Sequence, residues 1–294
     1  MYETFYGFRE KPFHVTADPS FLYPSHQHQE AFSHLKYGIA QQLGFILLTG
    51  EIGAGKTTVA KRLIRELQRP TRTALILNPM LNAAQLLRAI LRDLQTATDL
   101  PNATATSALP SQKGELLIAI EKLLLREAAI GGNIVILIDE AQDLSTLALE
   151  QLRLLSNIET AKTKLIQIVL VGQPELARRL ATNPKLSALH QRIAVRYEIL
   201  PLDKTEVADY IRYRLEQVSQ QGRVPQFTPE AIDRITELSR GNPRQINLLC
   251  DQALLAGFVH DSRVIDDRMV EEASAIVRGI PPAESKEAAH ELNR

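Results

Sequence analysis

The stretch Gly50-Glu51-Ile52-Gly53-Ala54-Gly55-Lys56-Thr57 decides the fold, because it fits the pattern G-x-x-x-x-G-K-[ST] at every defined position. A short apolar segment, residues 44–49, precedes it and is typical of a buried parallel strand. A helix is expected directly after it, at residues 56–68. Glycines let a backbone curl so that its N–H groups point at phosphate oxygens, and a helix N-terminus adds a favourable dipole. The stretch therefore predicts a phosphate-binding loop.

Two side chains of this loop carry most of its chemistry. Lys56 is expected to reach the β- and γ-phosphates of a nucleotide, and Thr57 to supply a hydroxyl to Mg²⁺. The alternative is a chance glycine turn, which the flanking strand and helix disfavour. The residues predicted to bind the nucleotide are consecutive: Gly50, Glu51, Ile52, Gly53, Ala54, Gly55, Lys56, Thr57 and Thr58.

Two carboxylates follow a second apolar segment, residues 134–138, further along the chain. Asp139 is predicted to hold the magnesium ion, directly or through water. Glu140 is predicted to polarise the attacking water as general base. Adjacent residues at a strand end point to opposite faces, so both acids serve one site only if the chain turns there.

Apolar segments and helical spacings alternate between residues 44 and 200. Strands are expected at residues 44–49, 73–77, 134–138, 165–171 and 195–200, and helices at 29–42, 56–68, 82–95, 113–129, 145–157 and 174–180. This alternation implies a mainly parallel sheet with helices on both faces.

The pattern changes after Pro201, where strands stop and three or four helices follow. Thr205 is expected to cap the first of these helices and Thr228 the second, which has Pro229 at its first position. We therefore predict three parts: an α/β core with an N-terminal arm at 1–200, a small helical domain at 201–278, and a polar tail at 279–294. A mobile loop is expected at 96–111.

Further polar side chains are candidates for the site. Gln173 follows the strand at 165–171, where it is predicted to orient the lytic water or sense the γ-phosphate; the alternative is an exposed loop amide. Arg192 precedes the last strand and is predicted to reach a neighbouring subunit's γ-phosphate, with Arg196 as the competing candidate. Arg244, at a helix start, is predicted to contact the nucleotide from the helical domain.

Composition bounds the class of protein. Of 294 residues, 45% are hydrophobic and 23% are charged, and 34 basic residues balance 34 acidic ones. This disfavours a disordered chain and a strongly basic nucleic-acid coat protein. The one cysteine, Cys250, forms no intrachain disulfide and is expected to be a buried structural thiol in a reducing compartment. No export signal or membrane helix is evident, so a soluble cytoplasmic protein is expected.

With these motifs placed, the chain resembles AAA+ ATPases, and more narrowly the ATPase module of the ExeA-type family of general secretion pathway protein A. The resemblance runs from residue 1 to about residue 277. Its blocks are Met1-Tyr2-x-x-Phe5-Tyr6-Gly7-Phe8-x-x-x-Pro12-Phe13, Asp18-Pro19-x-Phe21-Leu22-Tyr23, His28-x-Glu30-Ala31, Leu35-x-Tyr37-Gly38-Ile39, Leu48 to Thr58, Asp139-Glu140-Ala141-Gln142, Gly172-Gln173-Pro174-Glu175-Leu176, Gln191-Arg192-Ile193 and Gly241-x-Pro243-Arg244-x-Ile246-Asn247-x-Leu249-Cys250-Asp251.

This resemblance implies a P-loop AAA+ core, a parallel sheet sandwiched by helices, with a C-terminal all-helical lid. It implies Mg²⁺-dependent ATP hydrolysis, with sensor 1 at Gln173, an arginine finger at Arg192 and sensor 2 at Arg244. It further implies a homo-oligomeric ring with ATP at subunit boundaries. The membrane helix and peptidoglycan-binding region of that family have no counterpart in these residues, so no direct membrane insertion is expected.

Three functions remain open. The first is an ATP-hydrolysing motor or switch, accessory to secretion, pilus or envelope assembly, with an unknown client protein. The second is an ATP-dependent DNA-binding regulator of the transposition type. In that case basic clusters would line a ring interior and hold the DNA backbone, whereas in the alternative they are solvated helix faces. The clusters are Lys61-Arg62-Arg65, Arg88-Arg92 and Arg178-Arg179. The third is a nucleotide-gated interaction module with negligible turnover, which the intact Asp139-Glu140 pair disfavours.

Overall fold

The computed structural model describes residues 1–14, 21, 23–67, 71–77, 79–96, 109–110, 112–159, 164–220 and 224–279. Asp18, Pro19 and Leu22, most of the loop expected at 96–111, and the tail after Gly279 lie outside the described residues. The chain forms two compact units. We call His26–Glu51 with Lys56–Ile199 the sheet unit, and Met1–Ser25, Ile52–Gly55 and Leu200–Arg294 the helical unit.

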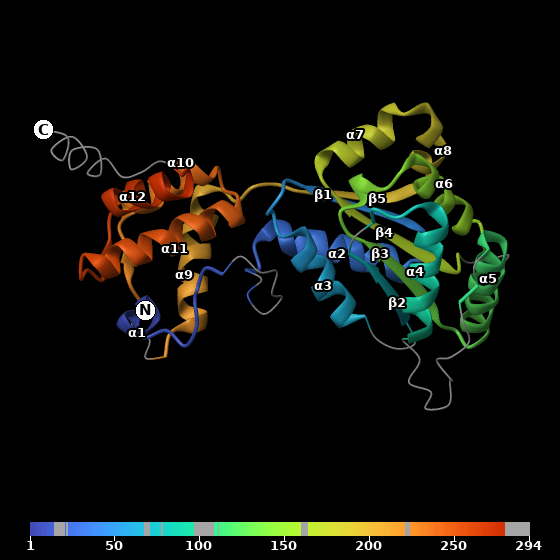
Figure 1. Ribbon diagram of the computed structural model, residues 1–294, viewed down its shortest axis with the longest axis horizontal. Coiled ribbons are helices and arrows are strands. Elements are labelled where there is room, and N and C mark those ends of the chain that lie inside the picture. Colours follow the sequence, from blue (N-terminus) through green and yellow to red (C-terminus); the bar gives the residue numbers. More distant parts are fainter. Residues whose placement is uncertain are drawn as a thin grey trace, which may run out of the picture. The chain divides into compact units, whose positions relative to one another are not determined.

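The sheet unit is built on a five-stranded parallel sheet in the order β2-β3-β4-β1-β5, flanked by helices (Figure 1). The strands are β1 (Phe45–Gly50), β2 (Thr71–Ile76), β3 (Asn133–Ile138), β4 (Ile166–Gly172) and β5 (Ile193–Ile199). Every residue of β1 and β4 is buried, because helices cover the sheet on both faces. Parallel pairing brings the carboxyl ends of β1, β3 and β4 to one edge of the sheet.

The helices of this unit bury apolar stripes against the sheet. They are α2 (His26–Ala40), α3 (Lys56–Glu66), α4 (Ala83–Thr96), α5 (Lys113–Ala129), α6 (Thr146–Leu155), α7 (Pro174–Thr182) and α8 (Ser187–Arg192). On α4 the buried residues repeat at helical spacing, from Leu86 to Leu94. The predicted parallel α/β arrangement is therefore confirmed. The six-residue α8 was not expected, because it is too short to show a period in the sequence.

The helical unit contains α1 (Tyr2–Tyr6), α9 (Lys204–Val218), α10 (Pro229–Ser239), α11 (Pro243–Val259) and α12 (Asp267–Val277). Its α9 begins two residues earlier than expected, because Asp203 rather than Thr205 is the cap and forms a capping box with Glu206. Thr228 caps α10 as predicted.

The expectation of no strand after Pro201 was wrong at one place. The segments β6 (Gln226–Phe227) and β7 (Val264–Ile265) form a short parallel pair. Two residues a strand are too few to show an alternating pattern, so the sequence gives no sign of it. The pair joins the starts of α10 and α12 into one packed unit, since Thr228 N donates to Ile265 O at 2.9 Å.

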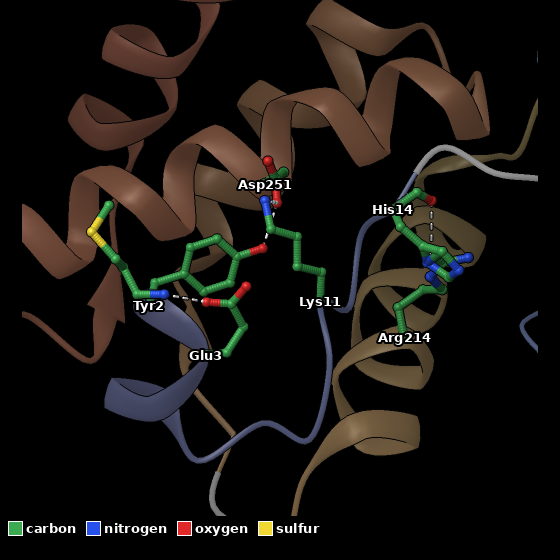
Figure 2. A network of polar contacts seen from close by, with 7 residues as sticks. Tyr2, Glu3, Lys11, His14, Arg214 and Asp251 are labelled. Carbon is green, nitrogen blue, oxygen red and sulfur yellow. Dashed lines mark hydrogen bonds and ion pairs between the residues drawn. The ribbon is translucent and has the colours of Figure 1, made fainter.

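The N-terminal arm belongs to the helical unit, which differs from the boundary predicted at residue 200. Arg214 of α9 is only 4% exposed and donates to Pro12 O at 2.6 Å and to His14 O at 3.1 Å. Figure 2 shows the same arm reaching α11, where Tyr2 donates a hydrogen bond to Asp251. Aromatic residues in the arm indicate packing, but Tyr2 and its partner Asp251 are 249 residues apart in sequence, so the contact leaves no local pattern.

Among the helices of the described residues, none has the length and apolar character needed to cross a bilayer.

Glycine substitutions test the helical unit. Gly241 has φ +73°, and a Cβ there would lie 2.0 Å from Leu202 O. Gly7 has φ +75° with nothing within 4 Å of its Cβ position, so it isolates the backbone strain. Gly7→Ala should cost about 1 kcal/mol of unfolding free energy, and Gly241→Ala more than about 3 kcal/mol because it adds the clash. Denaturant unfolding followed by circular dichroism measures both, and equal costs would contradict the close approach.

Candidate functional site

The loop between β1 and α3 curls at two glycines. Gly53 has φ +84° and Gly55 has φ +88°, in the left-handed region that residues with a Cβ rarely adopt. These are the positions at which the sequence pattern demands a turn. The curled backbone leads directly into Lys56, the first residue of α3, so the loop ends at a helix N-terminus.

Lys56 is held against the loop by its own ammonium group. The Nζ atom donates to Gly50 O and Glu51 O, each at 2.9 Å, and the residue is only 5% exposed. Burial lowers the pKa of this ammonium, while the negative charges of Glu140 and Asp139 act in the opposite direction. The two carboxylates predicted from the sequence therefore act on the same cation.

A hydrogen bond joins the start of α3 to the end of β3. Thr57 Oγ1 donates to Asp139 Oδ2 at 2.6 Å, and Asp139 Oδ1 accepts from Glu140 N at 3.0 Å. Asp139 is 4% exposed, and its burial raises the pKa of the carboxyl, which the bond from Thr57 opposes. A hydroxyl and a carboxylate oxygen side by side are hard ligands of the kind that Mg²⁺ prefers. The pair fits a magnesium ion that takes its remaining ligands from phosphate and water.

Glu140 leaves the strand geometry. Its backbone is left-handed, with φ 49° and ψ 39°, so the chain turns directly after Asp139. This is the turn that both acids need if they are to face one site. The Glu140 carboxylate accepts a hydrogen bond from Gln142 Nε2 at 2.8 Å.

Gln173 lies at the end of β4, where the sequence predicts it. Its backbone N–H donates to Gln142 Oε1 at 3.1 Å, and its side chain makes no capping bond to α7. Gln142 therefore links the ends of β3 and β4, a role that the sequence analysis missed. The signal available was its place two residues after Glu140, which alone does not predict a contact with another strand.

Arg192 lies at the end of α8 and bonds within its own chain. Its guanidinium donates to Arg153 O at 3.4 Å, to Ser156 Oγ at 3.3 Å and to Asn157. These groups form the C-terminal turn of α6, whose carbonyls a cation stabilises. The competing candidate, Arg196, is exposed and donates to His190 O at 2.6 Å. The structure gives neither arginine a hydrogen bond to Thr57, Asp139 or Glu140.

Arg244 lies at the start of α11 within the helical unit. Asn242 caps this helix, accepting from Arg244 N at 3.0 Å, and donates from Nδ2 to Ile52 O at 2.8 Å. A Cβ on Gly53 would lie 2.4 Å from Arg244 Cβ, so only glycine allows this approach. Arg244 and the middle of the phosphate loop are therefore neighbours in one unit. Asn242 was missed, although Asn before Pro243 is a helix-start signal.

Residues 39–180 match the AAA domain family. The five-stranded parallel sheet with flanking helices, followed by further helices towards the C-terminus, is the predicted AAA+ fold, which is therefore confirmed.

This chain resembles General secretion pathway protein A of Aeromonas hydrophila over nearly the whole length of this chain. The two are 44% identical over 285 residues, which cover 95% of this chain and 49% of that protein. The chain therefore spans about half the length of this curated relative. The predicted resemblance to the ExeA-type family is confirmed.

Solved structures share the fold at low sequence identity. The Aeropyrum pernix ORC2 protein in its ADPNP–ADP complexes matches with a TM-score of 0.63 and 15% identity, over 91% of this chain and 72% of that one. Drosophila ORC bound to DNA matches with 0.64 and 18%, over 92% and 64%. The Thermotoga maritima RuvB Holliday junction branch migration motor matches with 0.57 and 19%, over 91% and 73%. At these identities the likeness shows the fold alone.

Three other candidate residues make structural contacts within the chain. Cys250 is fully buried, and burial raises the pKa of its thiol, which suits a structural thiol. Arg179 was predicted to lie on a solvated helix face, but it donates to two backbone carbonyls instead. Arg62 pairs with Glu66 at 2.8 Å. No group of three or more His, Cys, Asp or Glu in the described part of the chain is placed to hold a metal.

Because the pKa of Asp139 is raised, we expect its neutral isostere, asparagine, to stabilise the ligand-free fold in a pH-dependent way. Ionising Asp139 costs free energy only in the folded chain, so the acid destabilises the ligand-free fold above its ordinary pKa of 3.8. Asp139→Asn should therefore unfold at a higher temperature than wild type at about pH 7, with a difference that shrinks as the pH falls towards that value.

Differential scanning calorimetry of the ligand-free chain across pH measures this difference. Asp143→Asn, at an exposed carboxylate in the same turn, is the matched control and should leave the unfolding temperature unchanged. A lower unfolding temperature for Asp139→Asn at neutral pH would contradict the assigned burial cost.

Proposed function

We propose that this AAA protein binds ATP with Mg²⁺, hydrolyses it, and acts as an oligomeric motor or switch in a secretion, pilus or envelope machine. The observation that carries the proposal is the 2.6 Å hydrogen bond between Thr57 and Asp139, made beside the curled loop. It brings the two predicted magnesium ligands together from segments 82 residues apart. The relation to a secretion pathway protein supports the pathway, and a cytoplasmic location is part of the proposal.

Each residue then has a chemical task. Bound MgATP supplies the γ-phosphoryl group that a water molecule attacks. Lys56, a buried ammonium next to two carboxylates, exchanges its loop carbonyls for phosphate oxygens, which are stronger acceptors. Thr57 and Asp139 hold the metal through their oxygens. Glu140, turned out of the strand, accepts the proton of the attacking water at its carboxylate.

Residues at the rim of the site complete the proposal. Gln173 is proposed to orient the water or sense the γ-phosphate, and Arg244 to respond to the nucleotide from the helical unit. Arg192 is proposed to act on a neighbouring subunit's nucleotide in a ring. Its bonds to the end of α6 then serve a second purpose, because they restrict the guanidinium before a partner arrives.

Substitutions of Lys56 and Glu140 should separate binding from turnover. Lys56→Ala removes the buried ammonium and should abolish ATP binding. Glu140→Gln keeps the shape but cannot take a proton, so it should bind ATP and lose turnover by about 100-fold or more. Fluorescent-nucleotide binding and phosphate release measure the two steps. Lys122→Ala, on exposed α5 surface, is the control for lysine loss. Retained turnover in Glu140→Gln would exclude it as the base.

Mixing experiments test the proposed action of Arg192 in trans. Arg192→Ala should bind ATP but lose turnover, and adding Lys56→Ala subunits should restore part of it. In a mixed ring, the first variant supplies an intact loop and the second an intact Arg192. Mixing Lys56→Ala with Glu140→Gln is the control and should restore nothing. No recovery in the first mixture, or the same recovery pattern for Arg196→Ala, would refute Arg192 as the finger.

The DNA-binding alternative shares this nucleotide site. Several arginines of the predicted basic clusters already pair within the chain, including Arg62 with Glu66 and Arg92 with Asp93. The structure therefore offers no specific observation in favour of that function. ATP-dependent binding to duplex DNA that weakens with salt would favour it.

A further inference from the structure

We propose that Gln142 is a positioning residue for Glu140, and that it couples this carboxylate to the start of α7 at Gln173. The inference rests on the proposed ATP hydrolysis, because it concerns the group proposed to take the proton from water. Its evidence is a hydrogen-bonded path that crosses from the end of β3 to the end of β4.

The path uses both ends of one amide. Gln142 Nε2 donates to Glu140 Oε2 at 2.8 Å, and Gln142 Oε1 accepts from Gln173 N at 3.1 Å. A carboxylate can only accept and a backbone N–H can only donate, so the linking side chain needs a donor at one end and an acceptor at the other. A glutamine side chain meets both needs at this length. Glutamate would offer acceptors only, and leucine would offer neither.

The end of β4 leaves room for this amide. A Cβ on Gly172 would lie 2.9 Å from Gln142 Oε1 and 2.8 Å from Leu176 Cδ2. Any larger residue at Gly172 would therefore displace the glutamine or the first turn of α7. The glycine is not needed for its backbone, since its φ is not in the left-handed region. Close approach of Gln142 and Leu176 is the reason that glycine fits here.

The backbone of the same turn is fastened to α7 as well. Arg179 Nη1 donates to Gln142 O at 3.0 Å and to Leu144 O at 2.7 Å, and its Nη2 donates to Thr146 Oγ1 at 3.2 Å. Side chain and backbone of the turn are thus both bound to one helix. A displacement of α7 would carry the turn, and with it the Glu140 carboxylate.

The hydrogen bond from Gln142 restricts the orientation of the Glu140 carboxylate. This residue sits in a left-handed turn, which costs an L residue about 1–2 kcal/mol, and its carboxylate accepts a hydrogen bond from Gln142 Nε2. The hydrogen bond from Gln142 therefore fixes the carboxylate in one orientation. Neither end of the Gln142 amide bonds to the loop at Gly50–Lys56, so its loss should affect turnover rather than nucleotide affinity.

Two substitutions at Gln142 separate its two bonds. Gln142→Leu removes both and should lower kcat about tenfold with KM within twofold of wild type. Gln142→Glu keeps an acceptor for Gln173 N but places a second carboxylate against Glu140, so kcat should fall at least as far. A Gln142→Glu variant with wild-type kcat would overturn the proposal, because the donor to Glu140 would then be dispensable. Gln41→Glu, at an exposed glutamine after α2, controls for the added charge.

A double-mutant cycle distinguishes positioning from a general structural role. If Gln142 acts through Glu140, adding Gln142→Leu to Glu140→Gln should not lower the residual single-turnover rate further. An additive loss would overturn the proposal. Wild-type chain that releases no phosphate refutes the ATPase function itself, whereas wild-type turnover with an unchanged kcat in both Gln142 variants refutes only this inference.

Discussion

The site depends on one geometric constraint: parallel strands must deliver the ends of β1, β3 and β4 to the same edge of a sheet. With β1 next to β4 and β4 next to β3, the phosphate loop, the acidic pair and Gln173 become neighbours although the chain separates them widely. The bond between Thr57 and Asp139 is the direct expression of that order, since it joins the start of α3 to the end of β3 at 2.6 Å. An antiparallel or reordered sheet would disperse the same residues.

Burying charged side chains at this edge of the sheet costs folding free energy when no ligand is bound. The pKa of Lys56 falls and the pKa of Asp139 rises, both because burial penalises the ionised form. A cationic metal and an anionic phosphate would each replace the lost solvation with an opposite charge. Ligand binding to such a site stabilises the folded chain. The left-handed turn at Glu140 adds to the strain that function demands of this edge.

Local patterns predicted the sheet, most helices and the loop, because buried strands and amphipathic helices leave periodic traces. Asp139 and Glu140 were predicted from their place after β3, and the turn that they require is present. The contacts of Gln142, Asn242 and Arg214 were not predicted, since each joins residues that only the tertiary fold brings together. The arm at Met1–Ser25 was assigned to the wrong unit for the same reason. The cap at Asp203 was missed by choosing the later of two polar residues.

The proposed function requires that these residues hold MgATP and cleave it. The most direct measurement is phosphate release from ATP by the wild-type chain over a range of protein concentrations, with Mg²⁺ and again with excess chelator. We expect turnover with Mg²⁺ that rises more than in proportion to protein concentration, as for sites completed by a neighbouring subunit, and no turnover with chelator. Phosphate release that is absent at every concentration, or that persists without Mg²⁺, would contradict the proposed function.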